Sequence, residues 1–349
     1  MTFLAHRTEE IGDGWGPRYA FGMQQRIFSG VQPTGNMHLG GYLGAFRNWV
    51  RFQDTYDTIY CIVDLHAMTV DYDPAELERS RIDTAKVLLA LGVDPDQSLL
   101  YAQSQVPAHA ELAWILGTMM PMGVLNRMTQ FKEKTAAGAA SNLGLYSYPV
   151  LMAADILVLR GNLVPVGDDQ RQHIELTRDL AQRFNNKFGD IFPIPEGFIP
   201  ETSARVMSLT DPTTKMSKSD PQVKSRVSLL DDADVIRKRI RSAVTDSDPE
   251  VRYDVGAKPG ISNLLEIMSA CTGDSIDSLV DQYGSGGYGV FKDAVADAVV
   301  AEVGPVKDRF RALRNSDVRD VLHSSGNRAN EMAEGYMAEV HRATGIEGF

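Results

Sequence analysis

Apolar positions along the chain alternate between short continuous runs and stretches with helical spacing. Continuous apolar runs at residues 58–64 and 99–103 are typical of strands buried in a parallel sheet. Between these runs, Pro74 and Gly92 bracket a predicted helix, because proline is favoured in the first helical turn and glycine just beyond the end. A further helix is predicted for residues 107–119. Strands that alternate with helices predict an α/β fold with a doubly wound parallel sheet.

The last third of the chain has a different pattern. From Asp231 onward the apolar spacing is helical, with interruptions at residues 256–260 and 284–289. A chain of 349 residues is long for a single hydrophobic core, so two domains are expected, with a boundary near residue 225. The predicted parts are an N-terminal extension at residues 1–25, an α/β domain at residues 26–225 and an all-helical domain at residues 226–349.

Composition narrows the class of protein. The chain is 43% hydrophobic and 23% charged, as ordinary soluble proteins are, and no apolar run reaches the length of a membrane span. The first residues lack the apolar core of a secretory signal. Two cysteines, Cys61 and Cys271, cannot form a structural metal cage by themselves and fit a reducing cytosol. The net charge of −11 argues against an extended nucleic-acid-binding surface and leaves room for a local basic patch. We therefore expect a cytoplasmic protein with no protein-bound structural metal.

A strand–loop–helix unit at residues 26–44 carries the first sign of chemistry. Gly30, Pro33 and Gly35 break regular structure after a short apolar run, and helical spacing resumes at Tyr42. A turn of this kind presents backbone N–H groups and the positive end of a helix dipole to an anion such as phosphate. Many such turns only connect a strand to a helix, and the spacing here is not that of a Walker loop.

Two short motifs occur together in this chain. Residues 38–41, His-Leu-Gly-Gly, resemble the HIGH motif, and residues 215–219 are the KMSKS motif, of class I aminoacyl-tRNA synthetases. The chain resembles the bacterial tryptophanyl-tRNA synthetase family from about Ile27 to the C-terminus. Further segments that resemble this family are residues 28–35, 62–67, 128–134, 151–157, 166–170 and 258–263.

This resemblance implies a fold and a reaction. The implied fold is a Rossmann-type catalytic domain with a C-terminal helical anticodon-binding domain, in a homodimer. The implied reaction converts L-tryptophan and ATP, which carries Mg²⁺, into tryptophanyl-adenylate and pyrophosphate. The tryptophanyl group then moves to the terminal ribose of tRNA(Trp). The implied partners are therefore tRNA, tryptophan and ATP, with no membrane.

The resemblance also assigns residues to a phosphate end of the site. His38 would donate to a phosphate, Lys215 and Lys218 would hold the β- and γ-phosphates as point charges, and Lys134 would be a further contact. Gly41 departs from the motif, because it replaces the last histidine and offers only a backbone N–H. The implied ATP-binding residues are Gln32, Pro33, Thr34, Gly40, Gly41, Gly167, Asp168, Asp169, Val206, Lys215, Met216, Ser217, Lys218 and Ser219.

Asp155 is the residue that sets the expected substrate. A carboxylate between Ala154 and Ile156, in an apolar run, is costly to bury unless it is paired. It can be half of a structural ion pair. The resemblance implies that it accepts the indole N–H of tryptophan, which is the only polar group of that side chain. The implied tryptophan-binding residues are Phe28, Met152, Val164 and Val166 around the ring, Tyr148, His66 and Gln170 at the α-amino and carboxylate groups, Gly30 for close approach to the backbone, and Asp155.

Simpler interpretations exist for single residues and for the whole chain. His38 can be a surface histidine, the motif lysines can belong to a solvated loop, and Asp168 or Asp169 can be only a helix N-cap. The chain can also be a nucleotidyltransferase acting on a small metabolite, the tyrosine-specific sister enzyme, or a catalytically inactive paralogue that binds RNA. The complete KMSKS pentapeptide and the predicted helical domain speak against a nucleotidyltransferase. Intact His38, Asp155, Lys215 and Lys218 speak against an inactive paralogue. Residues 152–155 and 167–170 favour tryptophan over tyrosine.

A basic run at Arg237, Lys238, Arg239 and Arg241 opens the predicted helical domain. Such a run can contact tRNA, and it is more often a solvated helix face. If tRNA binds through this run, its affinity should fall as the salt concentration rises, while adenylate formation should not depend on the run.

Overall fold

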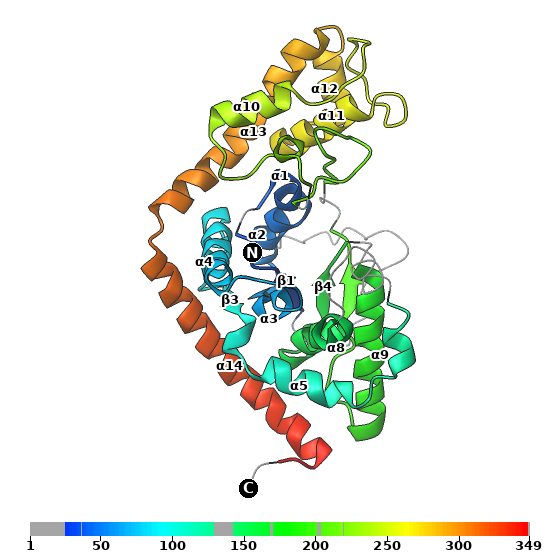
Figure 1. The fold of residues 1–349 in the computed structure, drawn as a ribbon, viewed down its shortest axis with the longest axis vertical. Helices are drawn as coiled ribbons and strands as arrows, with labels where there is room; N and C mark the ends of the chain where they lie inside the picture. Colours follow the sequence, from blue (N-terminus) through cyan, green and yellow to red (C-terminus); the bar gives the residue numbers. More distant parts are fainter. Residues whose placement is uncertain are drawn as a thin grey trace, which may run out of the picture.

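A five-stranded parallel sheet forms the centre of the fold (Figure 1). The computed structural model describes residues 25–35, 37–128, 142–167, 170–200, 204–218 and 220–347. The strands are β1 (Arg26–Val31), β2 (Asp57–Ile62), β3 (Ser98–Ala102), β4 (Leu163–Pro165) and β5 (Glu196–Phe198), in the order β3-β2-β1-β4-β5. The order reverses direction between β1 and β4, which confirms the predicted doubly wound sheet. Ligands of such sheets bind at the carboxyl ends of the two strands beside the reversal.

Helices connect the strands and lie on both faces of the sheet (Figure 1). The longest predicted one is confirmed, because α4 (Pro74–Leu91) begins at Pro74 and ends before Gly92, which has a left-handed φ of 113°. The others in this part are α1 (Leu39–Gly41), the π-helical turn η1 (Tyr42–Phe46), α2 (Arg47–Phe52), α3 (Asp64–Ala67), the 3₁₀ turn η2 (Gln103–Gln105), α5 (Ala108–Gly117), α6 (Met122–Leu125), α8 (Leu143–Val158), α9 (Arg171–Phe188) and the 3₁₀ turn η4 (Val223–Ser225).

The two faces of the sheet contribute to two separate hydrophobic cores. Along β2, Tyr60 and Ile62 lie in the first core, whereas Ile59 and Cys61 lie in the second, because side chains alternate across a strand. The first core includes α4 and continues into the helical part of the chain. The second core contains side chains of α5, α8 and α9.

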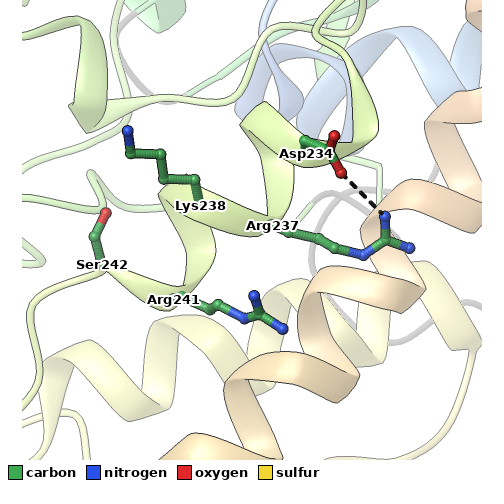
Figure 2. Close-up of a pocket in the computed structure, with 5 residues that line it drawn as sticks. All are labelled: Asp234, Arg237, Lys238, Arg241 and Ser242. Carbon is green, nitrogen blue, oxygen red and sulfur yellow. Dashed lines mark ion pairs between the residues drawn. The ribbon is translucent and has the colours of Figure 1, made fainter.

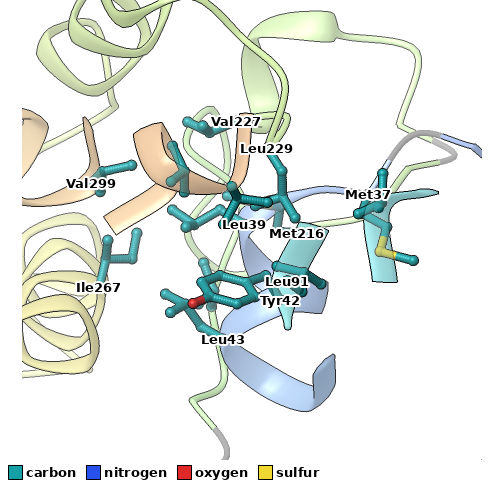
Figure 3. Close-up of a cluster of buried hydrophobic side chains, with 14 of the residues drawn as sticks. Met37, Leu39, Tyr42, Leu43, Leu91, Met216, Val227, Leu229, Ile267 and Val299 are labelled. Carbon is teal, nitrogen blue, oxygen red and sulfur yellow. The ribbon is translucent and has the colours of Figure 1, made fainter. Parts of the chain in front are cut away.

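The first core also joins the two sequence motifs. Figure 3 shows Leu39, from the HIGH-like turn, packed beside Met216 of the KMSKS motif and close to Val227 and Leu229. Leu39 is fully buried and the Met216 side chain is 2% exposed. Ile267, from the helical part, belongs to the same cluster. Apolar packing therefore holds the two motifs next to one another.

Beyond residue 198, the described ranges contain helices and no further strand, which confirms the predicted all-helical C-terminal part. Its helices are α10 (Ala233–Arg241), α11 (Pro259–Thr272), α12 (Ile276–Tyr283), α13 (Gly287–Ala312) and α14 (Asn315–Thr344). The predicted interruption at residues 284–289 is shorter than expected, because α13 already begins at Gly287. None of the helices found in the described ranges is long and apolar enough to cross a membrane.

The last helix returns to the sheet, which the sequence did not predict. α14 runs back along the α/β part and packs against β3, α4 and α5 (Figure 1). Its buried residues Ala333 and Met337 belong to the second core. An ion pair of 2.6 Å joins Arg160 to Glu339 of this helix. Gly326 lies so close to Gln105 that a Cβ there would come within 2.7 Å of its side chain. Residues 315–344 therefore lie with the α/β part in space, although they belong to the helical part in sequence.

Candidate active site

Polar residues gather at the carboxyl edge of the sheet. α3 follows β2 and carries His66, η2 follows β3 and begins with Gln103, and Val166 and Gly167 follow β4. The turn with Gln32, Pro33 and Thr34 follows β1 at the same edge, and both Gln32 and Thr34 are exposed. The predicted site residues thus follow three neighbouring strands, β1, β2 and β4, and Gln103 follows a fourth, as a ligand site in this fold requires.

Asp155, from α8, is fixed by three side chains at the centre of this edge. Its side chain is almost completely buried. His66 Nε2 lies 2.8 Å from Oδ2, while Gln103 Nε2 donates to Oδ1 at 2.6 Å. His109 Nδ1, from α5, lies 2.8 Å from the same Oδ1. These partners offset the cost of burying a carboxylate. The predicted need for a partner is therefore met, by His66 and by two residues that the sequence did not single out.

The charge of this carboxylate is set by the same partners. Burial alone would raise the pKa of Asp155, but the hydrogen bond from His109 and the contact with His66 outweigh it and hold the pKa well below its usual range. Asp155 is then ionised near neutral pH and acts only as an acceptor, with about four lone-pair positions. Three positions are taken, two on Oδ1 and one on Oδ2. One acceptor position on Oδ2 remains.

The network behind Asp155 extends into the second core. His109 is fully buried, and its Nε2 lies 2.9 Å from the Tyr101 hydroxyl. The side-chain oxygen of Gln103 accepts from the Leu65 N–H at 3.1 Å, which orients the amide so that its NH₂ group faces Asp155. His109 and Gln103, which contact the Asp155 carboxylate, are therefore fixed in turn by Tyr101 and by the Leu65 backbone.

The predicted apolar residues around a substrate ring lie in one cluster. Phe28 on β1 and Val164 on β4 are buried in the second core, and Met152 and Val166 pack against it partly buried. Gly30, on β1, approaches Val63 so closely that a Cβ would lie 3.0 Å from its side chain. The structure therefore brings together the predicted ring-binding residues from β1, β4 and α8.

The predicted polar end of a substrate amino acid lies beside them. The Tyr148 hydroxyl, from α8, is 2.8 Å from His173 Nε2, and its ring centroid lies 6.2 Å from that of His66. Gln170 immediately precedes α9. These three predicted residues come from separate helices, α3, α8 and the start of α9. The sequence missed His173, which ties Tyr148 to α9.

A cationic cluster marks the other end of the edge. His38 caps α1, because its Nδ1 accepts from the Gly41 N–H at 3.2 Å, and Nε2 is then the protonated nitrogen of a neutral ring. Burial, which is the largest cause, and the positive charges of Arg226, Lys215 and Lys218 together lower the pKa of His38 to about 4. A neutral His38 thus presents a donor from Nε2. The N–H of Gly41 is engaged with His38 inside the turn.

The KMSKS segment reaches across to the first strand. Lys218 Nζ donates to the Thr34 carbonyl at 2.5 Å. The Met216 N–H donates to the Val206 carbonyl at 3.1 Å, and Lys215 forms an antiparallel bridge with Met207. Burial lowers the pKa of Lys218; nearby Glu76 opposes this effect and Arg226 reinforces it.

Gly40 is where the two motifs touch. A Cβ at this position would lie 3.2 Å from both the Met216 Cβ and the His38 ring, so a larger residue would force these neighbours to shift. Lys134, Asp168, Asp169 and Ser219 were also predicted for this end of the site, and they lie outside the described residues. Ser217 and Gly167 are described, with Gly167 exposed beyond β4.

The basic run on α10 is more strongly paired than its sequence suggested. Figure 2 shows Arg237 and Arg241 extending in the same direction from this helix, with Asp234 beside Arg237, whereas Lys238 points away from them. Arg237 also pairs with Asp297 at 3.1 Å, Arg241 pairs with Asp293 at 2.5 Å, and Arg239 pairs with Asp231. Among the described residues, Lys238 alone of the four basic side chains forms no ion pair. A tRNA contact through this run would therefore have to compete with acidic groups on α13.

The parallel sheet, with Asp155 and a cationic cluster at its carboxyl edge, defines a class of protein. The chain matches the family model "tRNA synthetases class I (W and Y)" over residues 22–303 and belongs to that family. The predicted class I aminoacyl-tRNA synthetase is therefore confirmed.

Relatives within this class point to one amino acid. The chain is 49% identical over 322 residues to the Tryptophan–tRNA ligase of Caldanaerobacter subterraneus subsp. tengcongensis, covering 92% of this chain and 98% of that protein. It is 51% identical over 326 residues to the Tryptophan–tRNA ligase of Corynebacterium glutamicum, covering 92% of this chain and 94% of that protein.

Solved structures agree with the sequence relatives. Tryptophanyl-tRNA synthetase from Mycoplasma pneumoniae matches with a TM-score of 0.83 and 34% identity, over 93% of this chain and 98% of that chain. The enzyme from Campylobacter jejuni, complexed with ADP and tryptophan, matches with a TM-score of 0.81 and 34% identity, over 92% of this chain and 100% of that chain.

Proposed function

We propose that this chain is a tryptophan–tRNA ligase. It activates L-tryptophan with ATP, giving tryptophanyl-adenylate and pyrophosphate, and then transfers the tryptophanyl group to the terminal ribose of tRNA(Trp). The observation that carries the proposal is the buried, ionised Asp155 with an acceptor position left on Oδ2, beside an apolar cluster and at the same sheet edge as a cationic cluster. The relative solved with ADP and tryptophan supports an adenine nucleotide and tryptophan as the ligands.

Tryptophan recognition rests on the single polar group of the indole. Its N–H donates and cannot accept, so an ionised carboxylate, which accepts and cannot donate, is a matched partner. The indole N–H would occupy the remaining position on Asp155 Oδ2. The ring lies among Phe28, Met152, Val164 and Val166, with Gly30 allowing close approach to β1. Tyr148, His66 and Gln170 orient the α-amino and carboxylate groups.

Activation needs positioning and stabilisation of charge. The tryptophan carboxylate oxygen forms a bond to the α-phosphorus, the bond from that phosphorus to the bridging oxygen breaks, and pyrophosphate leaves with the electron pair. The protein contributes by orienting the reactants and by donating to the developing charge. His38 donates from Nε2 to a phosphate, and Lys215, Lys218 and Lys134 bind the leaving group, together with the Mg²⁺ carried by ATP.

The rest of the nucleotide lies along the loops of the same edge. The turn after β1, the HIGH-like turn and the KMSKS segment supply its proposed contacts. The proposed ATP-binding residues are Gln32, Pro33, Thr34, Gly40, Gly41, Gly167, Asp168, Asp169, Val206, Lys215, Met216, Ser217, Lys218 and Ser219. In this arrangement residues 26–225 form the catalytic unit and residues 226–349 the anticodon-binding unit, whose last helix braces the catalytic unit. The enzyme works in the cytoplasm.

The enzyme acts as a homodimer through one apolar surface. Trp114 on α5 is 78% exposed, Met122 on α6 is 64% exposed and Leu143 at the start of α8 is 77% exposed. These three helices are neighbours, and large exposed apolar side chains on neighbouring elements are typical of an interface. Sedimentation equilibrium should give a dimer for the wild type and a monomer for Trp114→Glu. A wild-type monomer at micromolar concentration would contradict this assembly.

The experiment that tests the function is amino-acid-dependent pyrophosphate–ATP exchange without tRNA. Tryptophan should support exchange, and tyrosine, at the same concentration, should not. Exchange with tyrosine alone would identify the tyrosine-specific sister activity. Absence of exchange with either amino acid would contradict the proposed activation step.

A further inference from the structure

Arg226 lies between the two motifs, although it belongs to neither. It directly follows η4, and the backbone after it pairs with the HIGH-like turn. The Leu39 N–H donates to the Val227 carbonyl at 2.8 Å, and His38 forms an antiparallel bridge with Ser228. Arg226 is therefore adjacent in sequence to Val227, whose backbone pairs with the HIGH-like turn.

The side chain of Arg226 reaches the other motif. Its Nη1 donates to the carbonyl of Asp220, the residue that follows the KMSKS pentapeptide, at 2.8 Å. Its own carbonyl accepts from Arg239 Nη1 at 3.0 Å, so the backbone is fixed from α10 as well. The residue is half-buried. One arginine thus connects the HIGH-like turn, the KMSKS segment and the helical part.

The charge around Arg226 is not balanced inside the described part of the chain. No carboxylate of the described residues forms an ion pair with Arg226, Lys215 or Lys218, and Glu76 acts on Lys218 only from a distance. The arginines of α10 are different, because Arg237, Arg239 and Arg241 each pair with an aspartate. Cations gathered without a counter-charge raise the local potential and attract an anion.

We propose that Arg226 is a catalytic residue that binds the leaving pyrophosphate together with Lys215 and Lys218. This inference rests on the proposed function and adds a residue to its phosphate end. Arg226 has one donor engaged with Asp220, and a guanidinium carries five N–H donors in a planar fork that fits phosphate oxygens. As the bond between the α-phosphorus and the bridging oxygen breaks, these donors take up charge that develops on pyrophosphate.

This role of Arg226 also compensates for Gly41, which has no side chain that could donate to a phosphate. The last position of the HIGH-like turn supplies no side-chain donor, and its backbone N–H is engaged with His38. Arg226 directly precedes the segment that pairs with His38 and Leu39 of this turn. The phosphate end therefore gains a donor from a segment outside both motifs.

The test uses Arg226→Gln and Arg226→Lys in the full chain, with Lys224→Gln as the matched control. Lys224 is an exposed lysine two residues earlier. Arg226→Gln should slow single-turnover adenylate formation by roughly tenfold to a hundredfold, the range for a lost hydrogen bond to a charged group. Binding of inorganic pyrophosphate, measured by calorimetry, should weaken by a similar factor. The Kd of tryptophan should stay within about twofold, and Arg226→Lys should recover part of the loss by keeping the charge.

A second readout separates charge from simple structural support. Arg226 lowers the pKa of His38, so removing its charge should raise that pKa, which NMR of the ring can follow. An unchanged His38 pKa with unchanged pyrophosphate affinity in Arg226→Gln would overturn the assignment. Equal weakening of tryptophan and pyrophosphate binding, in both Arg226→Gln and Arg226→Lys, would make Arg226 a structural link only. If wild-type protein shows no tryptophan-dependent exchange, the proposed function fails instead, whatever Arg226 does.

Discussion

The two ends of the candidate site treat charge in opposite ways. At the tryptophan end, Asp155 is buried and held by His66, Gln103 and His109. At the phosphate end, Lys215 and Lys218 lie in a group of cations that lacks an ion-paired carboxylate among the described residues. The first end is preorganised for one donor, whereas the second needs an anion to complete it.

This difference matches the order of events in the reaction. A preorganised acceptor serves recognition, because the indole N–H is present from the first encounter. Pyrophosphate charge develops only as the reaction proceeds, so lysines that meet it late favour the transition state over the ground state. Specificity is thus expected to depend on the Asp155 network and rate on the cations of the phosphate end. Each of the following experiments tests one side of this division.

The largest expected effect is the rejection of phenylalanine. A bound phenylalanine has no donor for Asp155 Oδ2 and would leave a buried carboxylate position unpaired. A site built around such a bond can discriminate by roughly 10⁴–10⁵. We expect kcat/KM for phenylalanine in pyrophosphate exchange to be lower than that for tryptophan by about this factor. A ratio near ten would mean that shape alone selects the substrate and that Asp155 does not read the indole.

Lys218→Ala should have the next largest effect, confined to rate. By analogy with the loss of an oxyanion-hole donor, losing a donor to developing charge costs roughly 10²–10³ in rate, about 2.7–4 kcal/mol. We expect single-turnover adenylate formation to slow by this factor while the Kd of tryptophan barely changes. Because Lys218 also donates to Thr34, a melting curve should accompany the kinetics. If Lys218→Ala weakened tryptophan binding by the same factor, the KMSKS segment would be part of the tryptophan pocket. The separation of recognition from rate would then be wrong.

His109→Leu should act on recognition and not on rate. The substitution removes a partner of Asp155 and leaves buried polar groups unsatisfied, which costs about 1–3 kcal/mol. We therefore expect the Kd of tryptophan to rise about tenfold, with the Kd of ATP unchanged. His109→Gln keeps a donor and is the matched control that should restore most of the affinity. Equal losses of tryptophan and ATP affinity in His109→Leu would assign His109 to general stability.

Gly41→Asn should have the smallest effect, and it should increase the rate of adenylate formation. A Cβ at Gly41 would meet Phe46 at 3.5 Å and His38 at 3.8 Å, which are ordinary contacts, so a side chain fits. An added amide donor near the phosphates is worth about 0.5–1.5 kcal/mol. We expect adenylate formation to quicken by a few-fold at saturating tryptophan. A slower reaction would show that this turn lies away from the phosphates.

The sequence predicted those elements whose ends are determined locally. The bounds of α4 follow from Pro74 and Gly92 alone, because each residue favours one helix end by its own backbone geometry. The return of α14 to the sheet could not be predicted in the same way. It depends on contacts between residues far apart in sequence, such as Gly326 against Gln105. No local pattern encodes such contacts.

The site was predictable to a similar degree. The sequence required that a carboxylate in an apolar run be paired, and Asp155 is paired. It could not say which residues do so, because Gln103 and His109 arrive from different elements of the fold. Gln103 does follow an apolar run, as His66 does, and this position at a strand end was a signal that could have been used. Arg226 gave no such signal, since arginines outside a motif are usually solvated.

Calorimetry of Asp155→Ala, titrated separately with tryptophan and with ATP, tests the central claim most directly. The claim is that the site has two ends with separate tasks, recognition at Asp155 and charge stabilisation at the KMSKS segment. The division predicts that Asp155→Ala loses measurable tryptophan affinity and binds ATP as the wild type does. Equal loss of both ligands would show that Asp155 only maintains the fold, and the account of recognition would then be wrong.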